Sequence, residues 1–146
     1  MRSRLLGGLA AIGLLLAPAA GGGTAAAKKG FGLSSIKGSY AGIFSGKTSS
    51  GLELLGTGVF ISDGEGGLTG HETFTVDATV CDATIKGTYT VNPDGTGADS
   101  IDFTTTTPGC TSGSYTQSLA VGGSGELVLL SNTNGDRINE EWHLQK

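Results

Sequence analysis

Three polar residues of this 146-residue chain fall where its strand pattern otherwise places apolar side chains. Glu72, Gln117 and Glu140 each lie on the apolar face of an alternating segment, and those segments are 68–76, 115–121 and 138–144. Burying a carboxylate is costly unless the group is hydrogen-bonded or paired. If these side chains point into one interior, they form a polar spot in an apolar cavity, which is the usual layout of a small-ligand site.

Two aromatic residues, Tyr89 and Trp142, lie on the apolar faces of their own segments and complete the set of candidate ligand-binding residues. The alternative is that the polar groups lie near a mouth in contact with water, or that a bulge turns them outward. Glu72 and Glu140 would also suit acid–base chemistry in a cyclase or isomerase, with the pKa of one carboxyl raised. No nucleophile motif accompanies them, so the sequence favours a non-enzymatic role, with no catalytic residue and no cofactor.

The chain has two cysteines, Cys81 and Cys110, and they lie about one hairpin apart. In an exported chain such a pair most simply forms one disulfide. A redox role would favour a C-x-x-C motif or an electropositive setting, and neither is present. We therefore predict a structural Cys81–Cys110 bond.

The two histidines, His71 and His143, fall on the polar faces of their segments. Their spacing carries no zinc signature. The acidic turn at 63–66 lacks the D-x-[DN]-x-[DN]-G calcium pattern and is adequately explained as a hairpin turn. The sequence therefore predicts no metal site.

Residues 1–27 have the features of a secretory signal peptide. Two arginines precede a short apolar run, Leu5–Leu16, and A-x-A cleavage sites end at Ala19 and Ala27. The apolar run is shorter than the roughly 20 residues that span a bilayer. We therefore expect cleavage after Ala19 or Ala27, export to the periplasm or the extracellular space, and no transmembrane segment in the mature protein.

The mature chain reads as strands separated by turns. Residues 28–35 lack any period and are expected to form a flexible leader, and residues 36–146 then form a single domain. Seven turn signals divide this domain, at 48–51, 63–66, 79–82, 93–96, 108–109, 122–125 and 134–135. Asp-Gly and Asn-Gly in several of them are strong hairpin signals, because the positive φ angles of tight hairpin turns suit Asn, Asp and Gly. Seven turns imply eight strands.

Between the turns, residues alternate with a period of two rather than with a helical period. Long consecutive antiparallel strands leave two exposed edges unless the sheet closes on itself. We therefore predict an all-β fold, an eight-stranded antiparallel up-and-down barrel, with a two-sheet β-sandwich as the alternative. The 27 glycines suit both the turns and the bends inside the strands of a small barrel.

The segment Gly87–Gly97 (GTYTVNPDGTG), flanked by Cys81 and Cys110, resembles a pattern in small exported bacterial proteins of unknown function. Those proteins are similar to lipocalin-like (calycin) and allene-oxide-cyclase-like barrels. The resemblance implies a calycin-type barrel and carries over no catalytic residue. The G-x-W motif near the start of true lipocalins is missing, since the single tryptophan is Trp142, at the other end.

Composition narrows the function classes. Thirteen acidic residues against nine basic ones argue against a basic surface that would bind nucleic acid. Few aromatics flank the strands, which disfavours a transmembrane barrel. We expect an exported barrel that binds a small apolar or amphipathic ligand in its interior. The alternatives are the cyclase- or isomerase-like enzyme and a structural or surface-interaction protein of the cell envelope, and the oligomeric state stays open.

Overall fold

The computed structural model describes residues 30–131, 133 and 135–146, so the expected signal peptide lies outside the described residues. Almost all of the described chain is β-strand, and its one helical element is the short 3-10 helix η1 (Leu33–Ile36). Among the described residues, no helix is long and apolar enough to cross a membrane.

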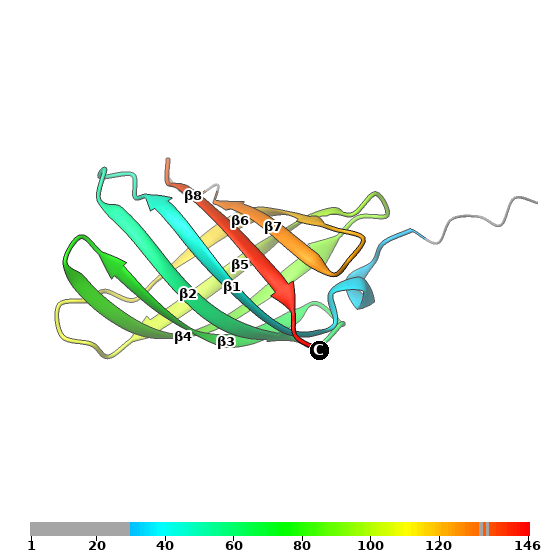
Figure 1. Ribbon diagram of the computed structural model, residues 1–146, viewed down its shortest axis with the longest axis horizontal. Coiled ribbons are helices and arrows are strands. Elements are labelled where there is room, and N and C mark those ends of the chain that lie inside the picture. The colour runs from blue at the N-terminus through cyan, green and yellow to red at the C-terminus, as the bar shows by residue number, and fades with distance from the viewer. Residues whose placement is uncertain (1–29, 132, 134) are drawn as a thin grey trace, which may run out of the picture.

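Eight antiparallel strands follow one another around a closed barrel (Figure 1). They are β1 (Gly38–Lys47), β2 (Glu53–Ser62), β3 (Gly67–Val76), β4 (Thr79–Val91), β5 (Thr96–Thr105), β6 (Gly113–Val121), β7 (Glu126–Ser131) and β8 (Arg137–Leu144). Each strand pairs with the next one in the chain, and β8 pairs with β1 from Tyr40↔Leu144 to Lys47↔Arg137. The all-β, up-and-down barrel is thereby confirmed, and the closure of β1 on β8 excludes the sandwich.

The predicted turn at residues 79–82 is wrong. β4 already begins at Thr79, and the two-residue connection is Asp77–Ala78, between the paired residues Val76 and Thr79. Asp77 has a φ of 51°, a left-handed conformation that Asp tolerates better than most side chains. Asp-Ala is a weak turn signal, and the strand runs through the residues at which the turn was predicted.

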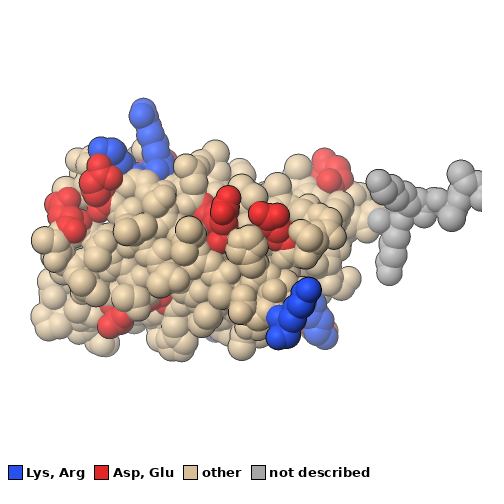
Figure 2. All heavy atoms as spheres, viewed as in Figure 1, with Lys and Arg blue, Asp and Glu red and all other residues tan. Residues whose placement is uncertain are grey.

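Side chains alternate between interior and exterior as the period of two predicts. On β4 the buried residues Ala83, Ile85 and Tyr89 alternate with exposed Thr, Lys and Asp side chains. Most of the visible wall carries neither acidic nor basic groups (Figure 2). Hydroxyl side chains cover part of the outer face, which also carries exposed apolar side chains such as Ile43 and Leu55, each 62% exposed. The larger side chains of the opposite face point into the barrel.

Two inward-facing glycines make room for the tryptophan. A Cβ at Gly42 would lie 2.6 Å from Cδ2 of Trp142, and one at Gly58 would lie 3.2 Å from its Cη2. The indole of Trp142 is therefore packed against bare backbone from two neighbouring strands, and only 2% of it is exposed. Its ring meets Phe60 edge-on at a centroid distance of 4.9 Å, and Phe60 stacks on Tyr40 at the same distance.

The end of the barrel that carries η1 and the turns β2–β3, β4–β5 and β6–β7 is filled, and we call it the closed end (Figure 1). Ile36 and Tyr40 are almost fully buried there. The hydroxyl of Tyr89 donates to the carbonyl of Leu33 at 3.2 Å, and Phe31 N–H donates to the carbonyl of Pro93 at 3.1 Å. Leu33 to Ser35, which were predicted to be part of the leader, belong to η1, and a hydrogen bond from Tyr89 holds Leu33 at this end.

Candidate functional site

The opposite end, formed by the connections β1–β2, β3–β4, β5–β6 and β7–β8, contains a cavity of about 590 Å³ and is called the open end. Apolar side chains form much of the wall: Phe44, Leu54, Phe74, Val76, Phe103 and Ile138. Five polar side chains lie deeper, on β3, β6, β7 and β8: Glu72, Tyr115, Gln117, Ser131 and Glu140. An apolar wall with a few convergent polar groups is the usual construction of a small-molecule site.

Aromatic rings that contact one another line one side of the cavity. Phe74 lies 6.5 Å from Phe44 and 6.1 Å from Phe103, measured between ring centroids. Phe103 in turn lies 6.0 Å from Tyr115. These rings lead from the mouth to the polar groups, because alternation places each of them on the inner face of its strand.

Glu140 is the best-satisfied carboxyl inside the barrel. Gln117 Nε2 donates to Glu140 Oε1 at 2.5 Å, and Trp142 Nε1 donates to Glu140 Oε2 at 2.8 Å. Burial raises the pKa of Glu140, and these two hydrogen bonds oppose the rise because they favour the ionised form. Each carboxylate oxygen therefore has a fixed donor from the protein.

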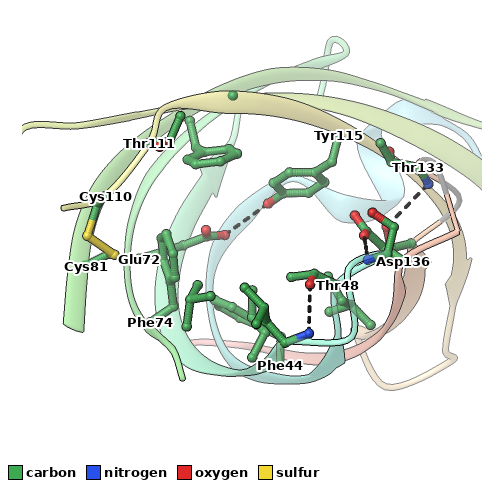
Figure 3. A pocket seen from close by; sticks show the side chains of 18 of the residues that line it. Phe44, Thr48, Glu72, Phe74, Cys81, Cys110, Thr111, Tyr115, Thr133 and Asp136 are labelled. Carbon is green, nitrogen blue, oxygen red and sulfur yellow. Dashed lines mark hydrogen bonds between the residues drawn. A yellow bond between two sulfur atoms is a disulfide. The ribbon is translucent and has the colours of Figure 1, made fainter. Parts of the chain in front are cut away.

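Glu72 lies across the cavity with a single donor. Tyr115 Oη donates to Glu72 Oε1 at 3.2 Å, and the two side chains point toward each other in Figure 3. Burial, reinforced by the nearby charge of Glu140, raises the pKa of Glu72 to about 7, while the Tyr115 hydrogen bond acts against the rise. Burial and the same carboxylates also raise the pKa of Tyr115 well above its ordinary value. Glu72 therefore changes its charge near neutral pH.

Asp99 is a third buried acid, and the sequence analysis did not single it out. It pairs in register with Gln117, its side chain is only 7% exposed, and its Oδ1 has no hydrogen-bond partner among the described residues. Burial and the charge of Glu140 raise the pKa of Asp99 to about 8. The alternating run of residues 97–103 places Asp99 on an apolar face, so the argument used for Glu72 would have found it.

The structure separates the five predicted ligand-binding residues into two groups. Glu72, Gln117 and Glu140 line the cavity. Trp142 lies behind Glu140 and does not line it, and Tyr89 is packed in the closed end, where Ser62 Oγ donates to its hydroxyl at 2.8 Å. A ligand-binding role for the first three stays a prediction, and the structure does not bring Tyr89 or Trp142 to the cavity.

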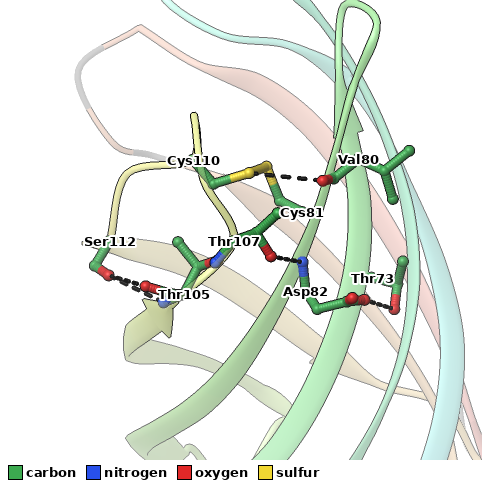
Figure 4. The surroundings of a disulfide bond; sticks show 8 residues. All are labelled: Thr73, Val80, Cys81, Asp82, Thr105, Thr107, Cys110 and Ser112. Atoms are coloured by element: carbon green, nitrogen blue, oxygen red, sulfur yellow. Dashed lines mark hydrogen bonds between the residues drawn. A yellow bond between two sulfur atoms is a disulfide. The ribbon is translucent and has the colours of Figure 1, made fainter.

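The predicted disulfide between Cys81 and Cys110 is present, and both residues line the mouth of the cavity (Figure 4). It ties the long β5–β6 loop to the start of β4, with a Cα–Cα distance of 5.9 Å. Next to it, the backbone N–H of Asp82 donates to Thr107 Oγ1 at 3.2 Å. These contacts fix one side of the mouth.

Both histidines are exposed on the outer wall, as their polar faces predict. Within the described part of the chain, no group of three or more His, Cys, Asp or Glu side chains is arranged to hold a metal ion.

The cavity has the size and the lining of an ordinary small-molecule pocket. Comparisons of the chain with protein-family models, with curated proteins and with solved structures found no match.

Proposed function

We propose that this protein is an exported carrier or sensor module that binds one small amphiphilic molecule in the open end of its barrel. The observation that carries the proposal is the cavity, whose aromatic wall ends at a cluster of buried polar groups. A volume of about 590 Å³ lies within the roughly 300–1,000 Å³ of ordinary ligand pockets. The apolar part of a ligand would lie along the rings, and its polar end would meet Glu72 and Tyr115.

Export is part of the same proposal. The predicted signal peptide and the disulfide support a periplasmic or extracellular location, since disulfides persist in oxidising compartments. The closed eight-stranded barrel is compatible with a lipocalin-like barrel, and such barrels have an interior of a size to hold one small ligand.

A neutral fluorescent probe, N-phenyl-1-naphthylamine, tests the binding function. We expect saturable binding to one site per barrel, and we expect Ser131→Phe to weaken it about tenfold or more, because Ser131 lines the cavity and a ring there would take up part of its volume. Ser100→Phe is the matched control, since Ser100 is exposed on the outer face of β5. Binding that does not saturate, or that survives Ser131→Phe unchanged in a folded protein, would contradict the proposal.

A second candidate function is acid–base catalysis in the same cavity, and the pKa of about 7 for Glu72 is the observation that favours it. A general acid or base works best when its pKa lies near the operating pH. Mass spectrometry of molecules that copurify with wild-type protein and with Glu72→Gln distinguishes the candidates. An enzyme retains a substrate in the variant and its product in the wild type, whereas a binding protein retains the same molecule in both.

A further inference from the structure

The polar cluster inside the barrel has many acceptors and few donors. Glu72, Asp99 and Glu140 are all less than 10% exposed, and no Lys, Arg or His lines the cavity. Within the described residues every Lys and Arg side chain is exposed. Two further acids, Asp77 and Asp136, line the cavity toward its mouth. The cavity is therefore lined by acidic residues from its mouth to its polar end and by no basic residue.

Side chains of the protein donate to both oxygens of only one of the three buried carboxyls. Glu140 receives two hydrogen bonds, from Gln117 and Trp142. Among the described residues, Tyr115 is the only hydrogen-bond partner of the Glu72 side chain. Asp99 is only 7% exposed and its Oδ1 has no partner among the described residues, but Asp99 is not among the residues that line the cavity. A buried acceptor with too few donors is costly, so Glu72 is the cavity-lining carboxyl that can accept hydrogen bonds from a ligand.

We infer that the polar end of the ligand is a protonated amine, placed against Glu72 and Tyr115, with its apolar body along the aromatic wall. This inference rests on the proposed binding function and specifies its ligand class. An ammonium group brings three donors and no acceptor, which complements a cluster that lacks donors. Rings beside a cation add an attraction of their own, and Tyr115 and Phe74 lie beside the carboxyl in Figure 3.

The other simple head groups fit less well. A carboxylate would place a further acidic group beside Glu72 and Glu140 in a buried space without a basic residue, where like charges repel strongly. A hydroxyl has a single donor and no charge to offset the carboxylates. The ammonium is therefore expected to bind most tightly of the three.

Binding of an ammonium is coupled to proton release. The titratable groups that face Glu72 inside the barrel are Glu140 on β8, Asp99 on β5 and Tyr115 on β6. None of them is basic, so the carboxyl of Glu72 holds its proton up to about neutral pH. A bound cation favours the carboxylate, and the proton passes to the solvent. Affinity for an amine should therefore increase from pH 6 to pH 8.

Three ligands with the same ten-carbon chain test the inference: decylamine, decanol and decanoate. Displacement of N-phenyl-1-naphthylamine at pH 7.5 should show decylamine binding about tenfold or more tightly than decanol, with decanoate the weakest. Equal or tighter binding of decanol or decanoate overturns the inference and leaves the proposed function standing. A chain that does not bind the probe at all overturns the proposed function itself.

The carboxyl is tested by substitution. Glu72→Gln should reduce decylamine affinity about tenfold and leave decanol affinity nearly unchanged, because only the charge partner is lost. Glu141→Gln is the matched control, since Glu141 is the exposed neighbour of Glu140 on β8. Calorimetry of wild-type protein in two buffers with different ionisation enthalpies provides a readout that does not depend on the variant's folding. Proton release on binding decylamine and none on binding decanol supports the inference, and equal proton exchange with both overturns it.

Discussion

The two ends of this barrel are built from the same alternating strands and are used differently. At the closed end, aromatic rings meet one another directly, and Tyr40, Phe60 and Trp142 leave little space between them. At the open end, rings of similar size line a cavity instead, and below them Glu140 has two donors whereas Glu72 has only Tyr115. Inward-facing glycines admit a ring at both ends, and the position of that ring differs. Gly42 and Gly58 let Trp142 lie across the interior, whereas Gly56 admits the ring of Phe44, which forms part of the cavity wall.

The two ends are also held together by different forces. A network of short polar contacts ties η1 to the closed end, through the hydroxyl of Tyr89 and the turn around Pro93. The mouth of the open end depends on one covalent bond, which anchors the β5–β6 loop. We infer that the closed end contributes most of the stability that comes from side-chain packing. The side chains of the open end pack less closely, because they surround a cavity.

Removing the disulfide should have the largest effect and should act on the open end. Cys81→Ala/Cys110→Ala releases a covalent loop with a sequence separation of 29, which should lower the free energy of unfolding by about 3–4 kcal/mol. Urea unfolding measures this loss. Hydrogen exchange should increase around residues 106–112 and stay slow near η1.

Wild-type protein in reducing agent is the control for the cysteine variant and should reproduce both effects. Faster exchange at the closed end, with the open end unchanged, would show that the disulfide does not act locally and would contradict the comparison.

The strands and their faces could be predicted from the sequence, and the depth of each side chain could not. Alternation correctly places Glu72 and Glu140 inside, because a period of two assigns a face to every residue. It treats Tyr89 and Glu72 alike, although they lie at opposite ends. Depth depends on how the strands are staggered around the barrel, and that stagger is a property of all eight pairings together.

The cavity itself was also beyond a reading of the sequence. Whether a barrel of this size is filled or hollow depends on which large side chains face which glycines across strand neighbours, as with Trp142 and Gly42. Those pairings join β8 to β1, the two ends of the chain, and no local pattern reports them. Asp99 is a different case, because the alternation of residues 97–103 by itself predicts that Asp99 lies on an apolar face.

Stability should fall as the pH rises, because the acids of the open end are buried without counter-charges. The pKa of Glu72 is about 7 in the folded protein, above its ordinary value of 4.5, so the folded state holds this proton more tightly than the unfolded state. The resulting stabilisation is fully present below about pH 4.5 and is lost as the pH rises through 7. For Glu72 alone the loss is about 3 kcal/mol.

Urea unfolding of wild-type protein and Glu72→Gln at pH 5, 6, 7 and 8 measures this effect. The variant should lose less stability across the series, and Glu141→Gln, at an exposed site, should follow the wild type. Parallel pH profiles for wild type and Glu72→Gln would show that Glu72 is not the buried acid described above.

The smallest effect should come from the closed end, where Tyr89→Phe removes one hydroxyl. Ser62 then loses its acceptor and the carbonyl of Leu33 loses its donor, so the free energy of unfolding should fall by about 1 kcal/mol. Tyr40→Phe is the matched control, because the Tyr40 hydroxyl is buried with no hydrogen-bond partner among the described residues, and its removal should cost nothing. Hydrogen exchange should increase at residues 33–37 in Tyr89→Phe only.

Probe binding should be unchanged in both variants, because the two hydroxyls lie outside the cavity lining. A tenfold change in the affinity of either variant for the probe would show that the two ends are coupled.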